Sequence, residues 1–228
     1  MNDDRYFNDF DFGDWDNSHI KSYRKVPMCL LVDTSGSMAT KDGTRLTKIE
    51  ELNQNIRALI DFIANDPKAN RICDLSIISF GGNVKVISGY DHVENIYFEN
   101  LKPSGATPLG EAVYKAIELL DLRRHYYREN EIEHYKPILV MMTDGAPTDD
   151  YKDAAASLSA MVLEKQVKVF PVGIGMGFEK KILGQFSPVI EPKQIKDTSG
   201  FALLFKLLSA STTNPNDDSL ERWFNDEF

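Results

Sequence analysis

The chain has 228 residues, 42% of them hydrophobic and 27% charged, which is long enough for one sizeable core and too short for two comfortable domains. Its net charge of −9 offers no positive field for nucleic acid, and no apolar run approaches the roughly 20 residues that span a bilayer. Because the N-terminus lacks the basic and apolar regions of a secretory signal, we expect a cytoplasmic protein that binds neither nucleic acid nor membrane.

Strand patterns and helix patterns alternate along the chain from residue 26 onward. Thr47 and Glu50 form a capping-box signature that opens the first helix, and a Gly-Gly-Asn turn at residues 81–83 predicts an antiparallel hairpin. We predict strands at residues 26–32, 72–80, 84–87, 137–142, 167–172 and 189–190. We predict helices at residues 48–65, 108–127, 178–183 and 201–209, and one from Asp149 or Asp150 to Gln166. The alternation predicts an α/β fold, with a doubly wound, mostly parallel central sheet, one antiparallel edge strand and helices on both faces.

Carboxylate and hydroxyl side chains gather where two of the predicted strands end. Residues 33–37 read Asp-Thr-Ser-Gly-Ser directly after the first strand, and residues 143–145 read Thr-Asp-Gly after the fourth. Between them, residues 104–108 hold a hydroxyl on a glycine-containing loop at the start of a helix. Since doubly wound sheets bind ligands outside the carboxyl ends of their strands, we expect these side chains to meet there. The candidate metal ligands are Asp33, Ser35, Ser37, Thr107 and Asp144.

An oxygen-only ligand set of this kind suits a hard divalent cation, Mg²⁺ above all. Two carboxylates roughly neutralise the charge of the ion, whereas neutral hydroxyl ligands leave it electrophilic toward a further anion. A cage of carboxylates alone would hold the metal more tightly but would repel an acidic ligand. We therefore predict an incomplete coordination shell that a carboxylate from outside the site completes.

Three motifs in this order resemble the von Willebrand factor A (vWA) domain with its metal-ion-dependent adhesion site (MIDAS). They are Asp-x-Ser-x-Ser at residues 33–37, Gly-Ala-Thr-Pro-Leu-Gly at residues 105–110 and Thr-Asp-Gly at residues 143–145. The likeness extends over most of residues 26–210. Two later segments look more like the bacterial cytoplasmic branch, similar to the TerY-like proteins of tellurium resistance, than like integrin or collagen-binding domains; they are residues 169–175 and 204–211. A polar insert at residues 39–44 departs from the family pattern and either screens the metal or adds contacts.

The resemblance implies a function as well as a fold. In such a domain the five candidate ligands hold Mg²⁺ or Mn²⁺, some of them through water, and an Asp or Glu of a protein partner completes the shell. The chain is then a non-catalytic, metal-dependent protein-protein interaction module in a bacterial stress-response or defence system. The partners that the resemblance suggests are AAA-type ATPases, protein kinases or phosphatases.

Two other functions compete with this interpretation. A metal-dependent phosphoester hydrolase would use Mg²⁺ as a Lewis acid on phosphate, but no general base stands at a motif position, so a histidine near the site would have to supply it. A scaffold or assembly subunit would dock through its termini, with the metal merely structural. The glycine-rich turn at residues 173–177 lacks the spacing of a dinucleotide-binding loop, and Cys29 and Cys73 are expected to be buried thiols.

The two ends of the chain differ from its middle, and we divide it into an N-terminal tail (1–24), a vWA domain (25–212) and a C-terminal tail (213–228). Residues 1–16 carry six aspartates against one arginine, and residues 217–228 carry five acids against one arginine. Residues 6–9 and 223–226 repeat an aromatic-Phe-Asn-Asp core. Such tails are either solubilising ends or docking segments with aromatic anchors, through which the chain could self-associate. In the sharpest form of the docking hypothesis, a tail carboxylate enters the metal site of the same or a neighbouring subunit.

Overall fold

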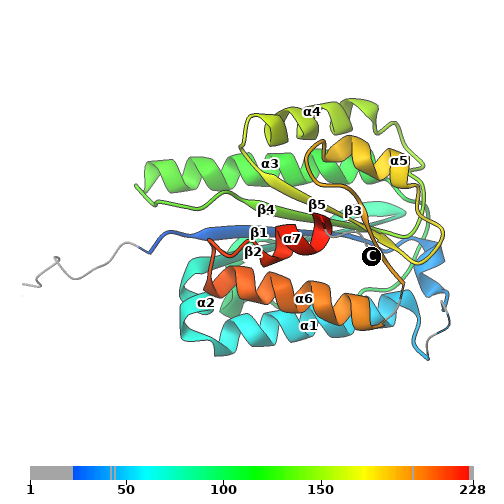
Figure 1. The fold of residues 1–228 in the computed structure, drawn as a ribbon, viewed down its shortest axis with the longest axis horizontal. Coiled ribbons are helices and arrows are strands. Elements are labelled where there is room, and N and C mark those ends of the chain that lie inside the picture. Colours follow the sequence, from blue (N-terminus) through cyan, green and yellow to red (C-terminus); the bar gives the residue numbers. More distant parts are fainter. Residues whose placement is uncertain (1–22, 42, 44, 197, 226–228) are drawn as a thin grey trace, which may run out of the picture.

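The computed structural model describes residues 23–41, 43, 45–196 and 198–225, which fold around a six-stranded sheet (Figure 1). The strands are β1 (Val26–Asp33), β2 (Cys73–Gly81), β3 (Asn83–His92), β4 (Ile138–Thr143), β5 (Lys168–Ile174) and β6 (Lys193–Ile195). They lie in the order β3-β2-β1-β4-β5-β6, and the edge strand β3 is antiparallel to β2 whereas the other neighbours are parallel. The predicted fold class is confirmed.

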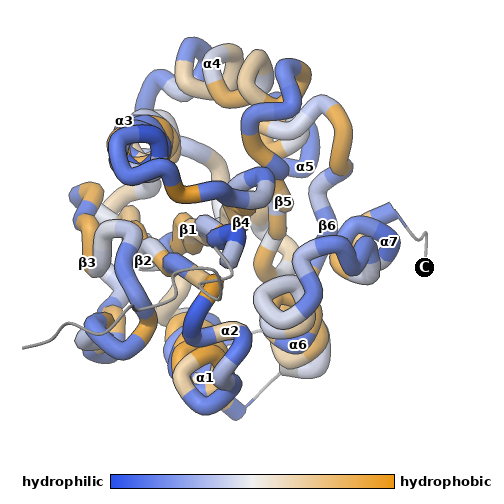
Figure 2. The backbone as a smooth tube through the Cα atoms, turned by 90° about the vertical axis from the view of Figure 1, so that its left-hand side faces the viewer, coloured by the Kyte–Doolittle hydropathy of each residue, from blue (hydrophilic) through white to orange (hydrophobic). Residues whose placement is uncertain are grey.

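Helices cover both faces of this sheet. The α-helices are α1 (Lys48–Asn65), α2 (Pro67–Ile72), α3 (Leu109–Glu129), α4 (Lys152–Leu163), α5 (Lys180–Leu183), α6 (Thr198–Thr213) and α7 (Ser219–Asn225). Short 3-10 turns are η2 (Gly36–Ala39), η3 (Val93–Asn95) and η4 (Gly184–Phe186). α3, α4 and α5 lie on one face and α1, α2 and α6 on the other, whereas α7 lies beside β6 (Figure 1 and Figure 2). Within the described part of the chain, no helix is both long and apolar enough to span a membrane.

The central strand β1 is buried along its whole length because helices cover both faces of the sheet. All eight of its residues are buried, so it reads as a continuous apolar run that ends in a carboxylate. Successive side chains enter opposite core layers: Leu30 belongs to the layer of α1 and α6, and Leu31 to the layer of α3 and α4. Packing on both faces therefore holds the end of β1 in a defined place.

The first helix begins where the capping box predicts. The Thr47 hydroxyl accepts a hydrogen bond from Glu50 N (3.3 Å), and the Glu50 carboxylate accepts one from Thr47 N (2.8 Å). The hydrogen bond from the Thr47 amide is the main cause of a lowered pKa at Glu50. Because this reciprocal pair fixes the start of α1, Lys48 is its first helical residue.

One local prediction is wrong, and another is correct for one of its two alternatives. Residues 189–190 form no strand; Ile190 N instead donates to Ser187 Oγ (3.3 Å) in a loop, and the edge strand β6 begins only at Lys193. A pair of apolar residues marks burial, but it does not distinguish a strand from a loop anchored in the core. Of the two acids predicted to start the fourth helix, Asp149 does not cap α4, because its carboxylate accepts hydrogen bonds from Gly110 N (3.1 Å) and Glu111 N (2.9 Å) in the first turn of α3. Asp150 Oδ1 instead accepts a hydrogen bond from Lys152 N (3.4 Å), the first residue of α4. Helix α2, which the sequence analysis does not foresee, follows α1 directly.

Part of the predicted C-terminal tail packs on the sheet. Residues 219–225 form α7, whose Leu220 and Phe224 are buried. The centroid of the Phe224 ring lies 5.1 Å from that of Phe170 on β5. Residues 1–22 and 226–228 lie outside the described residues, and with them lies the hypothesis that a tail carboxylate enters the metal site.

A buried carboxylate stands at the opposite end of the sheet, near the start of β2. Asp74 is fully buried and accepts hydrogen bonds from three side chains, Tyr127 (2.5 Å), Arg123 (2.5 Å) and Lys25 (3.3 Å). Burial by itself would raise the pKa of Asp74, but the hydrogen bonds from Tyr127 and Arg123 and the two positive charges outweigh it and lower this pKa. The network ties the start of β1 and the second half of α3 to β2.

Candidate metal centre

The order of the strands reverses between β1 and β4, which is where doubly wound sheets form a ligand crevice. Asp33 is the last residue of β1, and Asp144 directly follows β4. In the parallel pairing of these strands Val32 stands opposite Met142, so the two carboxylates emerge side by side. Both carboxylates are almost completely buried, at 0% and 2% exposure. The sheet thus brings together the two acids that the sequence places 111 positions apart.

Two donors hold the Asp33 carboxylate. Its Oδ1 accepts a hydrogen bond from Ser35 N (2.7 Å), and its Oδ2 accepts one from Thr143 Oγ1 (2.6 Å). Burial raises the pKa of Asp33, and the negative charge of Asp144 adds to this, while the hydrogen bonds from Ser35 and Thr143 act in the opposite direction. The ionised form of Asp33 is therefore less favourable than that of an exposed aspartate.

A chain of hydrogen bonds joins the turn after β1 to Asp144. Ser35 Oγ lies 2.9 Å from Ser37 Oγ, and Ser37 Oγ donates to Asp144 Oδ1 (2.6 Å). Four of the five predicted ligands are thereby connected through direct contacts. Ser37 is exposed whereas Asp33, Ser35 and Asp144 are buried, so the cluster opens to solvent on the side of Ser37.

A lysine that the sequence analysis missed contacts the same cluster. Lys48 Nζ donates to Asp144 Oδ2 (3.1 Å), and the Lys48 side chain is only 10% exposed. Lys48 opens α1, where the helix macrodipole disfavours a positive charge. The Asp144 carboxylate offsets that unfavourable interaction. The sequence contained one signal for this contact, a lysine at the first position of a predicted helix, where the macrodipole disfavours a positive charge.

The fifth predicted ligand lies on a loop that is fastened to the same edge of the sheet. Gly36 N, in the turn after β1, donates to Gly105 O (3.0 Å). Thr107 N donates to Thr148 Oγ1 (3.0 Å), which joins this loop to the segment after β4. Among the residues that the structure describes, none forms a hydrogen bond with the Thr107 hydroxyl, and the hydroxyl is not joined to the other four candidates. Its oxygen is therefore available to a cation.

Two glycines allow this loop to approach the turn between β2 and β3. Gly105 and Gly82 both have φ of +68°, in the left-handed region that favours glycine. A Cβ atom on Gly105 would lie only 2.4 Å from Gly82 Cα. Gly82 N in turn donates to Ala106 O (2.8 Å). The position of Thr107 thus depends on glycine at residue 105.

Replacement of Gly105 by Ala is expected to displace the Thr107 loop, because the added Cβ meets backbone and the φ is strained. We expect the free energy of unfolding to fall by about 1–3 kcal/mol and divalent-cation affinity to fall with it. Chemical denaturation and calorimetric titration with Mg²⁺ measure the two effects. Gly89→Ala is the matched control, since a Cβ there meets nothing within 4 Å. Equal behaviour of the two variants would contradict this role of Gly105.

The described histidines lie away from the metal centre. His92 ends β3 and approaches Asp74 at the opposite end of the sheet. His134 forms a bridge with Lys25, just before β1 begins, and His125 lies in the second half of α3. The general base that a phosphoester hydrolase requires is therefore not supplied by these three residues. His19 lies outside the described residues.

The donor set fits a hard divalent cation. It consists of oxygen atoms alone, two carboxylates and three hydroxyls, from Asp33, Ser35, Ser37, Thr107 and Asp144. Asp33 and Asp144 supply the two negative charges, and the exposed side near Ser37 leaves room for a further ligand. A divalent cation held by these residues would supply an electrophilic centre for a carboxylate ligand.

Comparison with known families agrees with this geometry. The von Willebrand factor type A domain matches residues 28–199 of the chain. That span contains all five candidate ligands, the whole of β4 and β1 from Met28 onward.

Solved structures of the same fold come from several sources. The manganese-loaded TRAP protein of Plasmodium vivax is 18% identical with a TM-score of 0.56, over 79% of this chain and 72% of that one. PTMP1 of the mussel byssus, with a zinc-occupied MIDAS motif, is 16% identical with a TM-score of 0.56, over 83% and 48%. The ArnB paralog VWA2 of Sulfolobus acidocaldarius is 19% identical with a TM-score of 0.54, over 84% and 45%. The chain thus spans about half the length of the latter two, and the likeness establishes a shared fold.

Proposed function

Because the chain belongs to the von Willebrand factor type A family, we propose that it is a non-catalytic, metal-dependent protein-binding module. The five candidate ligands hold a divalent cation, Mg²⁺ or Mn²⁺, and a carboxylate of a protein partner completes the shell. The zinc and manganese in two proteins of similar fold support the choice of a divalent cation. In this proposal the chain's own residues bind the cation and orient its open side toward the partner.

One observation carries the proposal. Two buried carboxylates and two serine hydroxyls form a connected cluster at the switch point of the sheet, and the cluster opens to solvent at Ser37. Burial makes the ionised form of Asp33 less favourable than in water, as its raised pKa indicates, and a bound cation would offset this effect. A cation with one exposed coordination position satisfies both features.

Affinity capture tests this function directly. Immobilised full-length protein is expected to retain a partner from native lysate in Mg²⁺ and to release it in EDTA. Asp144→Ala is expected to lose the partner, while Asp61→Ala, which removes the same charge from an exposed position on α1, retains it. Capture that continues undiminished in EDTA would contradict the proposal.

The lysine in the cluster should weaken metal binding. The Lys48 ammonium and a divalent cation compete for the same Asp144 carboxylate and repel each other. We expect Lys48→Met to raise the affinity for Mg²⁺ by about tenfold, since about 1.4 kcal/mol of relieved repulsion corresponds to that factor. Calorimetric titration of Mg²⁺ into both proteins measures the difference.

Lys41→Met is the control for this substitution. Lys41 is exposed and its replacement changes the net charge by the same amount. An affinity gain in both variants would point to net charge rather than to the contact with Asp144. A weaker affinity in Lys48→Met would show instead that the ammonium orders Asp144 for the metal.

We further propose a bacterial cytoplasmic setting, in a stress-response or defence system of the tellurium-resistance type. The TerY-like segments at residues 169–175 and 204–211 support this setting. The cysteines support a reducing compartment, because Cys29 and Cys73 are buried free thiols, as the sequence analysis expects. Burial raises the pKa of the Cys29 thiol to about 12. AAA-type ATPases, protein kinases and phosphatases are the partners to examine first.

A further inference from the structure

A groove lies between β6, α7 and the loop after β5, and it shares no lining residue with the metal centre. Its volume is about 1120 Å³. The apolar part of its lining includes Phe178, Val189, Pro192, Leu203 and Trp223. Val189 is 65% exposed and Leu203 is 40% exposed. Apolar side chains in this groove therefore remain open to a ligand that brings apolar groups of its own.

The same groove carries basic side chains. Among the described residues of its lining are three lysines, Lys180, Lys193 and Lys196, and one acid, Glu191. Glu191 pairs with Lys180 (3.0 Å), so the described part of the lining holds more basic than acidic side chains. Such a surface favours an acidic ligand.

Residues 223–225 of α7 form an aromatic-Phe-Asn motif that already packs beside this groove. The Phe224 ring is 4% exposed, and the Trp223 ring stands edge-on to it with centroids 5.1 Å apart. Lys193 Nζ donates to Trp223 O (2.7 Å) and lies 5.3 Å from the centre of the Trp223 ring. A lysine beside an aromatic ring is thus already part of the groove.

The chain carries a second version of this motif. Residues 223–226 read Trp-Phe-Asn-Asp, and residues 6–12 read Tyr-Phe-Asn-Asp-Phe-Asp-Phe. We call residues 6–12 the aromatic segment. Its last four residues alternate acidic and aromatic side chains, so an extended backbone would present acids on one side and rings on the other. This pattern matches a groove that is apolar on part of its lining and basic on the rest.

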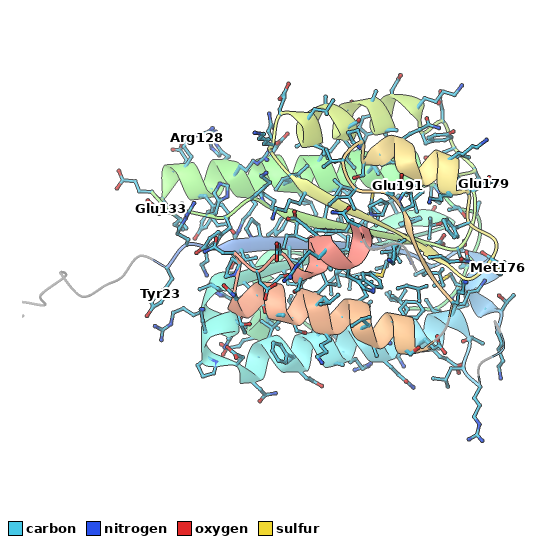
Figure 3. All side chains as sticks on the ribbon, viewed as in Figure 1. Tyr23, Arg128, Glu133, Met176, Glu179 and Glu191 are labelled. Carbon is cyan, nitrogen blue, oxygen red and sulfur yellow. The ribbon has the colours of Figure 1, made fainter. Side chains whose placement is uncertain are left out.

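The aromatic segment can reach the groove of its own chain. The described chain begins at Tyr23, well away from Glu191 in the view of Figure 3. The backbone from Phe10 to Tyr23 extends to roughly 45 Å. A domain of this size has a radius of gyration of about 16 Å. The connection is therefore long enough to pass along the molecule.

We propose that the aromatic segment docks in the groove between β6 and α7 of its own chain. Its rings pack on the apolar lining near Val189 and Leu203, and its aspartates face the lysines. The proposal concerns a surface distinct from the metal centre and holds whether or not that centre binds metal.

Engineered disulfides in the full-length protein test the docking. Asn8→Cys is combined with Val189→Cys in the groove or with Tyr97→Cys, a 79% exposed position outside it. Cys29 and Cys73 are buried and stay out of the reaction. Equilibrium with glutathione then measures the effective concentration of each pair. We expect about a tenfold higher value for the groove pair.

Two further variants make the result specific. Replacing the three phenylalanines of the aromatic segment by alanine is expected to lower the effective concentration of the groove pair to that of the Tyr97 pair. Lys196→Glu is expected to lower the effective concentration of the groove pair as well. Adding Asp9→Lys and Asp11→Lys to the Lys196→Glu variant should restore it, because opposite charges then face each other again. Equal effective concentrations for the two pairs would overturn the proposal. Disulfides that form mainly between chains would also overturn it, because the segment would then occupy the groove of a second copy.

Discussion

Asp33→Asn is expected to abolish divalent-cation binding without weakening the metal-free protein. In the wild type, Mg²⁺ or Mn²⁺ at a hundredfold excess over Kd should stabilise the fold by about 2.7 kcal/mol. That is a rise in Tm of roughly 5–10 °C for a domain of this size. The variant lacks one of the two negative charges of the ligand set, so its Tm should not respond to either ion. Thermal unfolding with and without metal makes the comparison.

The stability of the metal-free variant follows from the raised pKa of Asp33. Burial, with a further contribution from Asp144, places this pKa above the ordinary value of 3.8, so the folded state binds the proton more tightly than the unfolded state. Stability of the metal-free wild type should therefore fall as the pH rises from about 3.8 through the raised pKa, and stay at that lower level at higher pH. The neutral asparagine amide carries no such charge, so Asp33→Asn should unfold at the same temperature as the metal-free wild type or a higher one.

Asp61→Asn serves as the control, because it makes the same substitution at an exposed position on α1. It should retain the full metal-induced shift in Tm. A metal-induced shift that survives in both Asp33→Asn and Asp144→Asn would show that the cation binds elsewhere. Loss of the shift in Asp61→Asn as well would point to net charge as its cause.

Asp74→Asn is expected to be the most destabilising charge-removing substitution, at about 3–5 kcal/mol. It leaves the cations of Arg123 and Lys25 without their buried counter-charge, at a point where β1, β2 and α3 meet. Arg123 Nε already lacks a hydrogen-bond partner among the described residues. Urea denaturation at neutral pH measures the loss.

The contribution of the Asp74 carboxylate to stability changes with pH in the opposite direction to that of Asp33. The pKa of Asp74 is lowered, so its contribution to stability is present above the unfolded-state value of 3.8 and disappears as the pH falls through the lowered folded-state value. Asp74→Asn should therefore lose less stability on acidification than the wild type does. Asp121→Asn, which removes a 62% exposed partner of Arg124, should cost no more than about 1 kcal/mol. Comparable losses in the two variants would exclude a special role for the buried network.

Local patterns were sufficient for the fold class and for most elements. The apolar run of β1 indicated burial on both faces, and the Thr47–Glu50 box located the start of α1 to the residue. Both signals are encoded within a few neighbouring residues. The failures have the same origin, because each pattern was compatible with two local structures. The apolar pair at residues 189–190 fits a strand or a loop anchored in the core, and Asp149 could cap α4 or accept hydrogen bonds from the start of α3. Neighbouring residues did not distinguish between them.

For the metal centre, the sequence indicated which strand ends carry oxygen ligands, because motifs at residues 33–37 and 143–145 follow apolar runs. It did not indicate which side chains hold those ligands. Thr143 donates to Asp33 across 110 positions of sequence, and Lys48 pairs with Asp144 across 96. Such contacts exist only because β1 and β4 are neighbours and α1 begins beside their ends. Strand order and helix placement arise from packing of the whole core, which short patterns do not encode, so the partners of these acids became visible only in the folded chain.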